Sequence, residues 1–415
     1  MNHLHSTDTV LAHEGRSHNQ PGSPVNPPVY RQSTLLFHGT DALDAVRGTP
    51  LAYGRHGSPT TRALEKALAR LEGAHAALLT PSGLSAITTA LLAVLNPGDH
   101  LLMADSVYDP TRSFCDETLA RLGIATTYYD PTIGADIASL MQPNTRAVFA
   151  ESPGSLTFEV QDIPAISRVA HQHGAVVLLD NTWGTPLNFR SFSHGVDVSI
   201  HAATKYIAGH SDVLMGAILT TEALAPKVTR FYRQLGMTVS GDDAYLALRG
   251  LRTLSVRLER HQRNAHVLTD WLSRQPEVAR ILYPARPGDA GHALWQRDFT
   301  GACGLFGVVL HPQADEAVRA LLDGMTCFGM GYSWGGFESL IIPSNPTRHR
   351  TATQWAAAGP LLRIHAGLEH PDDMIADLAA GFARMRAAAL AEARHPATSR
   401  APPHITFSST FFTLS

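Results

Sequence analysis

An aspartate and a lysine each follow an apolar segment in the middle of the chain. The run at 175–180 ends in Asp180, and Lys205 follows the run at 196–200 within HAATKY. In parallel sheets, ligands bind at the carboxyl ends of strands, so both positions suit residues that meet a ligand. A lysine among small residues can be desolvated, which keeps its amine nucleophilic for a Schiff base. Taken singly, Asp180 could merely cap a turn and Lys205 could be solvated.

The segment TPSGLS at 80–85 adds a candidate anion site. It lies between an expected strand and an apolar helix, so free backbone N–H groups and the Ser82 hydroxyl would point at an anion. Many strand-to-helix turns carry Ser-Gly, so this loop is weak evidence by itself. Together with Asp180 and Lys205 it predicts pyridoxal phosphate (PLP), which needs a carboxylate for its ring nitrogen, a lysine for its aldehyde and a site for its phosphate.

Short apolar runs alternate with helix-length segments around these residues. A run as continuous as 175–179 indicates burial on both faces, as in a parallel sheet covered by helices. A helix is expected from Thr60, capped by Thr60 or Thr61 and ended by Gly73. The expected strands are residues 76–79, 100–104, 124–129, 146–151, 175–180 and 196–200. The fold class predicted is α/β, with a large, mostly parallel sheet.

The same pattern divides the chain into four parts. Residues 1–58, interrupted by Pro, Gly and Ser, are expected to form an extended arm that lies on a neighbouring subunit. Residues 59–251 form the α/β domain. Residues 252–393 form a smaller α+β domain with a long helix through 271, strands near 303–310 and 325–330, and a final helix at 371–393. Residues 394–415 are expected to be a loose tail.

Composition excludes several classes of protein. The 415 residues are 44% hydrophobic and 17% charged, with 33 basic and 36 acidic residues, which argues against disorder and against a nucleic-acid-binding surface. No apolar stretch is long enough to span a bilayer, and no secretory signal is recognised, so a cytoplasmic location is expected. Three cysteines fit reduced thiols. The 22 histidines show no ligand spacing, so no metal is expected.

Eight segments resemble the Cys/Met-metabolism family of PLP-dependent enzymes, which have fold type I. They run in the family's order over about residues 30 to 392: YGRHG, DSVYDP, ESPGS, LLDNTW, SIHAATKYIAGHSD, RGLRTL, YSWGGFESL and LLRIHAGLE. Within the family, ESPGS, HAATKY and YSWGGFESL look most like the bacterial cystathionine β-lyases. The resemblance implies a carbon–sulfur β-lyase that converts L-cystathionine to homocysteine, pyruvate and ammonia.

The resemblance also implies roles for individual residues. Lys205 would bind the cofactor covalently and shuttle protons, Asp180 would pair with the ring nitrogen, and Tyr108 would stack on the ring. The phosphate would be held by Ser82, Gly83, the Leu84 N–H and Thr204, and from the neighbouring subunit by Tyr53 and Arg55. Arg363 would bind the substrate α-carboxylate, Ser333 would orient Lys205, and Tyr332 and Trp334 would line the substrate pocket. A dimer with shared sites is implied, paired into a tetramer.

Two departures from the family pattern leave alternatives open. Ala202 replaces a serine that usually contributes a phosphate hydroxyl, and His56 stands where some β-lyases carry a second arginine. The substrate could therefore be another sulfur-containing amino acid, such as the disulfide cystine or the thioether djenkolate. The alternatives are a γ-eliminating or γ-replacing relative, a broader cysteine-S-conjugate lyase, and a binding or regulatory protein that keeps the fold without turnover.

Overall fold

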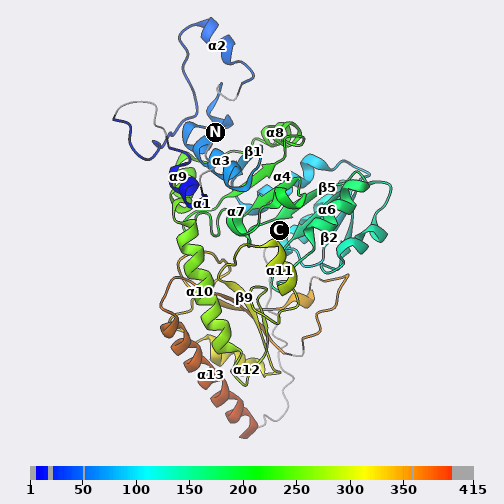
Figure 1. Cartoon of the computed structure of the whole chain (residues 1–415), viewed down its shortest axis with the longest axis vertical. Coiled ribbons are helices and arrows are strands. Elements are labelled where there is room, and N and C mark those ends of the chain that lie inside the picture. The colour runs from blue at the N-terminus through cyan, green and yellow to red at the C-terminus, as the bar shows by residue number, and fades with distance from the viewer. Residues whose placement is uncertain (1–5, 17–21, 50–51, 349, 358, 395–415) are drawn as a thin grey trace, which may run out of the picture.

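The computed structural model describes residues 6–16, 22–49, 52–348, 350–357 and 359–394. The chain forms a larger part around a seven-stranded sheet and a smaller part around a four-stranded sheet. Helix α10 (Leu254–Leu272) leads from the larger part into the smaller (Figure 1). Across these described ranges, no helix combines the length and apolar character that crossing a membrane requires.

The larger sheet has the strand order β1-β7-β6-β5-β4-β2-β3. Strands β3, β2, β4, β5 and β6 are parallel, whereas β7 runs antiparallel to β6 and β1. Every residue of β2, β6 and β7 is buried, and because consecutive strand residues point to opposite faces, both faces are covered. The strands are β1 (Ala76–Thr80), β2 (His100–Ala104), β3 (Ala125–Tyr129), β4 (Thr145–Glu151), β5 (Val176–Asp180), β6 (Val198–His201) and β7 (Gly216–Thr220).

Helix α3 (Pro59–Glu72) shows how local sequence sets the helices of the larger part. The Ser58 hydroxyl accepts the Thr61 N–H, and the Thr61 hydroxyl accepts the Ser58 N–H. The prediction of Thr60 or Thr61 as the cap was therefore wrong, whereas Gly73 does end the helix, at φ 79°. The other elements are α4 (Gly83–Val94), α5 (Asp109–Ser113), η2 (Phe114–Leu119), η3 (Gly134–Leu140), α6 (Ile163–Gln172), α7 (Thr185–Asn188), η4 (Ser191–His194), α8 (Ala225–Gln234) and α9 (Gly241–Arg252).

The smaller sheet is antiparallel throughout, with the order β10-β11-β9-β8. Its elements are β8 (Val278–Leu282), α11 (His292–Asp298), β9 (Leu305–Leu310), α12 (Asp315–Leu322), β10 (Leu340–Ser344), η5 (Pro346–Arg348), β11 (Leu361–His365) and α13 (Pro371–Arg394). Fold type I, with a large mostly parallel sheet and a smaller second part, is confirmed. We propose the same division after residue 251 for the folded chain, since α9 ends at Arg252 and α10 begins at Leu254.

The N-terminal segment differs from the expected extended arm. It contains α1 (Thr7–His13), α2 (Thr40–Val46) and the short helix η1 (Gly54–His56). Helix α1 packs on α3 and α9 of its own chain, with Leu11 buried and its carbonyl accepting from Arg252 at 2.7 Å. A seven-residue helix is too short for a period to be recognised in sequence. In contrast, α2 stands out from the rest of the chain (Figure 1). The expected tail at 395–415 lies outside the described residues.

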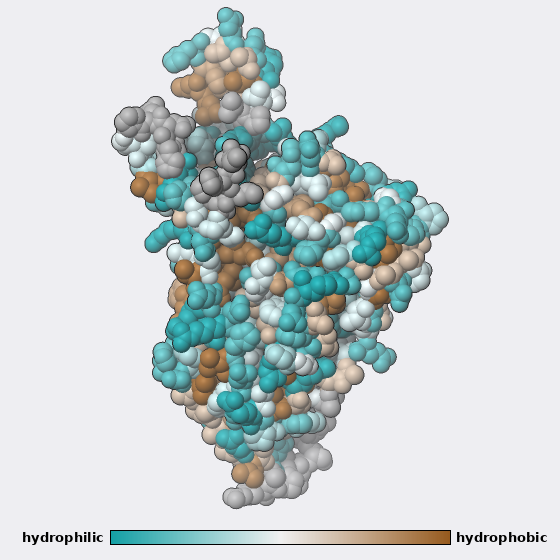
Figure 2. Space-filling model, viewed as in Figure 1, coloured by the Kyte–Doolittle hydropathy of each residue, from teal (hydrophilic) through white to brown (hydrophobic). Residues whose placement is uncertain are grey.

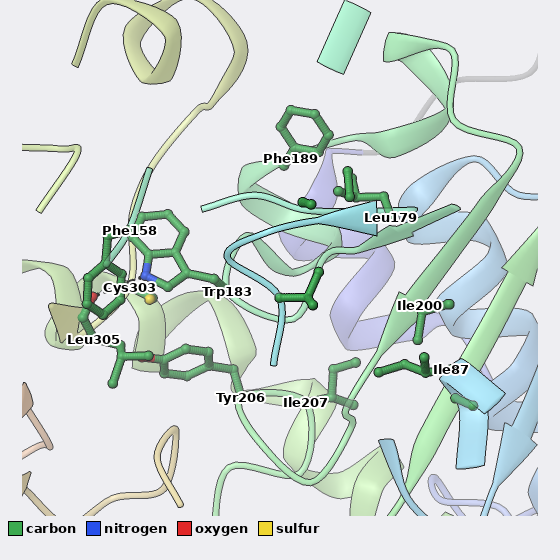
Figure 3. Packing of buried hydrophobic residues seen from close by; sticks show 14 of the residues in the cluster. Ile87, Phe158, Leu179, Trp183, Phe189, Ile200, Tyr206, Ile207, Cys303 and Leu305 are labelled. Carbon is green, nitrogen blue, oxygen red and sulfur yellow. Dashed lines mark hydrogen bonds between the residues drawn. The ribbon is translucent and has the colours of Figure 1, made fainter. Parts of the chain in front are cut away.

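The two parts share a buried core. Figure 3 shows Trp183 and Tyr206 of the larger part lying close to Cys303 and Leu305 of the smaller. The Trp183 indole N–H donates to the Leu305 carbonyl at 3.1 Å, and the Tyr206 hydroxyl accepts the Gly304 N–H at 3.0 Å. Residues from both parts can therefore be held in fixed positions around one site.

Several strands were misjudged from sequence, since β8, β10 and β11 of the smaller sheet were not predicted. Strand β7 was not predicted, and the strand expected at 325–330 was wrong, since only Gly329 there forms an isolated bridge. The backbone N–H groups of Thr326, Cys327 and Phe328 instead donate to the Asp377 carboxylate on α13. A side chain distant in sequence thus takes donors that a strand partner would have used.

Candidate active site

Asp180 and Lys205 lie at the carboxyl end of the parallel strands, as expected. Asp180 ends β5 and is buried, and its Oδ1 accepts the Thr182 N–H at 3.0 Å and the Thr182 hydroxyl at 2.5 Å. The Thr182 oxygen also accepts the Ala202 N–H, which ties this strand end to the loop that carries Lys205. Burial raises the pKa of Asp180 above its ordinary value, and the charge of Lys205 opposes this. A cationic ring nitrogen placed here would favour the carboxylate form.

The Lys205 amine is held by a residue of the smaller part. Its Nζ donates to the Ser333 Oγ at 2.8 Å and lies 5.4 Å from the centre of the Trp334 ring. Burial, followed by the positive charge of Arg363, lowers the pKa of Lys205 to about 8. The amine is therefore neutral far more often near pH 8 than an exposed lysine would be. This is the state in which a lysine attacks an aldehyde.

The two glycines after Trp334 allow this approach. Gly335 has φ +86°, and a Cβ there would lie 2.9 Å from the Lys205 carbonyl carbon and the Tyr206 nitrogen. A Cβ on Gly336 would lie 2.1 Å from the Ser211 hydroxyl. Only residues without a side chain let this turn rest on the Lys205 backbone.

The amino end of α4 forms a cradle suited to a phosphate. Ser82 caps the helix, and in the described residues the N–H groups of Gly83 and Leu84 have no hydrogen-bond partner. A Cβ on Gly83 would lie 2.5 Å from the Ala202 Cβ, so the cradle is pressed against the loop that carries Lys205. Free helix N–H groups beside a reactive lysine fit the phosphate and aldehyde ends of PLP.

The Thr204 hydroxyl is engaged elsewhere in this conformation. It donates to the Met215 carbonyl at 3.2 Å and accepts the Met215 N–H at 2.9 Å. A hydroxyl has a single proton, so it cannot also donate to a phosphate while this pair is formed. The predicted phosphate contact of Thr204 therefore requires rotation of its side chain.

Tyr108 lies on the same edge of the sheet and is half exposed. Its backbone N–H donates to the Glu151 carboxylate at 2.7 Å. Burial and the charge of Glu151 raise the pKa of Tyr108, and both Arg363 and Asp180 act on it, so its phenol stands within their electrostatic reach. Because burial raises its pKa, the phenol is protonated at neutral pH and available to stack on a bound ring.

Glu151 was missed as a site residue. It ends β4 in register with Asp180, so two carboxyl groups lie on adjacent strand ends. Burial and the negative charge of Asp180 raise the pKa of Glu151 well above its ordinary value, which favours its neutral form. Glu151 stood in the quoted ESPGS segment, and its position at a strand end was the signal that could have identified it.

Arg363 on β11 supplies a cation with no carboxylate partner among the described residues. Its guanidinium donates to the carbonyls of Gly331 at 3.2 Å and Ser333 at 3.0 Å. Burial lowers the pKa of Arg363 to about 10, so the group is still charged at neutral pH. A partly buried guanidinium without a carboxylate partner among the described residues suits a carboxylate brought by a substrate. Tyr332 is largely exposed and Trp334 packs on Tyr206; that the two line the substrate pocket stays a prediction.

Tyr53 and Arg55 do not join this site within one chain. The Tyr53 hydroxyl lies 3.4 Å from the Ser33 hydroxyl, and Arg55 donates to the Arg233 carbonyl at 3.2 Å. None of the contacts found for these two residues in the described ranges reaches Lys205 or the cradle. Among the described residues, Arg55 therefore does not contact the phosphate cradle of its own chain.

A buried polar hub lies behind the two strand ends. The Glu72 carboxylate accepts hydrogen bonds from Asn181 at 3.1 Å, Ser191 at 2.6 Å, Ser199 at 2.5 Å and His201 at 2.6 Å. Burial alone would raise the pKa of Glu72, but these donors bring it below its ordinary value. The hub joins α3, η4, β5 and β6 and sets the relative positions of the ends that carry Asp180 and Lys205. In the described part of the chain, no cluster of three His, Cys, Asp or Glu side chains could hold a metal.

A fold with a lysine, a strand-end carboxylate and a helix-end anion cradle in this arrangement defines a fold-type I PLP-dependent enzyme. The chain belongs to the Cys/Met metabolism family of PLP-dependent enzymes, whose family model matches residues 8–383, and PLP is its cofactor.

Individual relatives cover nearly the whole chain. A cystathionine β-lyase of Salmonella typhimurium is 44% identical over 91% of this chain and 98% of its own. An L-alanine/L-glutamate racemase of Wolbachia pipientis is 40% identical over 91% of this chain and 97% of its own. The structure of a cystathionine γ-synthase from Xanthomonas oryzae matches with a TM-score of 0.85 and 32% identity, over 92% of this chain and 99% of that one.

Proposed function

We propose that the protein is a carbon–sulfur β-lyase that converts L-cystathionine and water to homocysteine, pyruvate and ammonia. One observation carries the proposal: Lys205 and Arg363 both hydrogen-bond to Ser333, the first through its hydroxyl and the second through its carbonyl. The turn at Ser333 therefore contacts both an amine that can accept a proton and a guanidinium that can bind a carboxylate. An enzyme that removes the Cα proton of an α-amino acid needs both groups. The Salmonella relative bears this activity in its name.

Bound PLP supplies an electron-poor ring that accepts the charge left when the Cα proton departs. Arg363 would bind the substrate carboxylate in the bidentate manner that its planar fork allows. Lys205, largely desolvated, would take the Cα proton at its Nζ, with Ser333 directing the amine. Asp180 would hold the proton on the ring nitrogen, and Ser82 with the Gly83 and Leu84 N–H groups would hold the phosphate. The Cβ–S bond would break with its electron pair going to sulfur, which would take the proton held on the Lys205 Nζ and leave as homocysteine. The remaining 2-aminoacrylate would be released and hydrolysed by water to pyruvate and ammonia.

We further propose that the active site is shared between the subunits of a dimer, with dimers pairing into a tetramer. Tyr53 and Arg55 have a hydroxyl and a fork-shaped cation suited to phosphate, yet both lie away from the site of their own chain. The segment around α2 stands out from the molecule and carries apolar surface (Figures 1 and 2). Its exposed side chains include Leu36 and Leu43, which would be covered if the segment packed on a partner.

The proposed setting is the cytoplasm, with a small amino acid as the partner of the site. All three cysteines are unpaired, which suits a reducing compartment. Neither nucleic acid nor membrane is expected as a partner.

Product analysis tests the function. The PLP-loaded protein is incubated separately with cystathionine, cystine, djenkolate and L-alanine, and the keto acids, thiols and D-amino acids are quantified. Pyruvate and homocysteine from cystathionine are expected. Dominant 2-oxobutyrate and cysteine would indicate γ-elimination, dominant D-alanine from L-alanine would indicate a racemase, and no turnover would indicate a binding protein; each contradicts the proposal. If cystine or djenkolate releases pyruvate faster than cystathionine does, that compound is the preferred substrate instead of cystathionine.

A further inference from the structure

The turn at 333–338 is held between the lysine and strand β11. On one side Gly335 rests on the Lys205 backbone, where a Cβ would come within 2.9 Å. On the other side lies His365, the last residue of β11, which is 1% exposed. The position of Ser333 relative to Lys205 therefore depends on what fixes this turn.

His365 spans the turn with both ring nitrogens. Its Nε2 accepts the Gly335 N–H at 3.1 Å, so its Nδ1 carries the proton and donates to the Glu338 carbonyl at 3.1 Å. Burial, then the charges of His261, Arg363 and Lys205, lower the pKa of His365 well below its ordinary value, which keeps the ring neutral. Only a neutral imidazole can accept at one nitrogen while donating at the other.

Arg363 depends on the same turn. It lies two residues before His365 on β11, so both side chains point to one side of the strand. Its guanidinium is aimed by the carbonyls of Gly331 and Ser333. A shift of the turn would therefore move the hydroxyl that holds Lys205 and the carbonyl that aims Arg363 together.

We propose that His365 is a positioning residue for the reaction, because its two hydrogen bonds fix the 333–338 turn and thereby set both the Lys205 amine and the Arg363 guanidinium. The expected effect on kcat/KM rests on the proposed function. The hydrogen bonds of His365 to the 333–338 turn do not depend on it.

The test compares His365→Phe with a matched control, His100→Phe. His100 is equally buried at 1% exposure, and both of its ring nitrogens lie 2.8 Å from threonine hydroxyls. It begins β2, away from the carboxyl strand ends that form the site. Both variants lose two buried hydrogen bonds, so a purely structural cost should be similar in the two, and thermal unfolding measures it.

Two readouts separate positioning from stability. Inhibition by propanoate, a carboxylate without an amine, reports on Arg363, and the pH titration of the yellow PLP chromophore reports on Lys205. We expect His365→Phe to weaken the binding of propanoate about tenfold and to shift the pH at which the PLP chromophore titrates. It should also lower kcat/KM by about 100-fold. His100→Phe should leave all three unchanged. His365→Gln, which keeps an acceptor and a donor, should recover much of the loss.

The inference is overturned if His365→Phe and His100→Phe behave alike in the propanoate and chromophore measurements, or if His365→Phe matches the wild type. Should His365→Phe fail to fold, His365→Asn, which is too short to reach the Gly335 N–H, takes its place with the same expectations. If the wild-type protein releases no pyruvate, the proposed function fails, while the propanoate and chromophore measurements still decide the role of His365.

Discussion

Lys205 is subject to four influences that can be separated by experiment. Burial and Arg363 lower its pKa, Asp180 raises it, and Ser333 fixes the direction of its amine. The Asp180–Lys205 pair could be predicted from sequence because the residues follow apolar runs, and strand ends are where ligands bind. The Thr204 hydroxyl pairing with Met215 could not, since it depends on a backbone group that only the folded loop brings near.

Lys205→Ala should abolish the yellow colour and covalent attachment of PLP, together with nearly all turnover. The same side chain supplies the covalent link and the general base, so the loss should span many orders of magnitude. Borohydride reduction followed by peptide mass analysis measures attachment. Lys66→Ala, an exposed lysine of α3, is the control. Wild-type attachment in Lys205→Ala would refute the assignment.

The rate of PLP capture by the cofactor-free protein should rise with pH and level off above about pH 8. Burial and Arg363 lower the pKa of Lys205 to about 8 from its ordinary 10.5, so the neutral amine is already the major form above that pH. Stopped-flow absorbance measures the rate from about pH 6 to about pH 10, a range that includes the lowered pKa and approaches the ordinary one. A rate still climbing tenfold per pH unit up to pH 10 would contradict the prediction.

Arg363→Met should raise KM more than it lowers kcat. The guanidinium has no carboxylate partner in the described residues and can bind the substrate carboxylate with two hydrogen bonds. Losing charged hydrogen bonds should reduce kcat/KM by about 10- to 100-fold. Steady-state kinetics with cystathionine measure the effect. An unchanged KM would assign the carboxylate to another residue.

At the scale of elements, the site depends on strand ends held in place by α3. The sequence predicted six strands of the larger sheet within one or two residues, because buried parallel strands are continuous apolar runs. It missed β7, although residues 213–219 form a continuous apolar run that could have predicted this strand. It also missed the hub around Glu72, whose donors come from η4, from β6 and from the residue after β5. Contacts of that kind are set by the tertiary fold rather than by local pattern.

Glu72→Ala should destabilise the protein by about 3–5 kcal/mol, because it removes the acceptor that four buried donors share, and of these only Asn181 also donates to backbone carbonyls. The pKa of Glu72 is lowered in the folded state from its ordinary 4.5, so its contribution is fully present above that value and is lost as the pH falls through the lower folded pKa. Urea unfolding at neutral pH and at about pH 3 measures the free energy of unfolding of the wild type and of Glu72→Ala. The difference in this free energy between the wild type and the variant should be smaller at the lower pH. An equal difference at both pH values would contradict the predicted pH dependence.

At the scale of the whole molecule, Tyr53 and Arg55 of one chain contact neither Lys205 nor the phosphate cradle of that chain among the described residues. Arg55 lies on the arm side, whereas the cradle at Ser82 faces Lys205. The family resemblance implied that Arg55 serves the neighbouring subunit, which stays a prediction, and the sequence did not predict that α1 would pack on its own chain.

Mixing two inactive variants tests the shared site. Lys205→Ala and Arg55→Ala chains are unfolded together and refolded. About half of the dimers should be mixed, and each has one intact site of two, so activity should recover to roughly a quarter of the wild type. Recovery no greater than the sum of the separate variants, with mixed dimers verified, would mean that Arg55 serves its own chain or none.

The contact between Lys205 and the turn at 333–338 also bears on the order in which the enzyme is made. The hydrogen bond from Lys205 to Ser333 joins residues 128 positions apart, and Arg363 follows 30 residues later. A nascent chain that has emerged only as far as the larger sheet therefore has the lysine, the strand-end carboxylate and the anion cradle, but nothing to direct the amine. Cofactor capture should accordingly be a late event of biosynthesis, and messages truncated before the codon for Ser333 should yield ribosome-bound chains without the yellow colour.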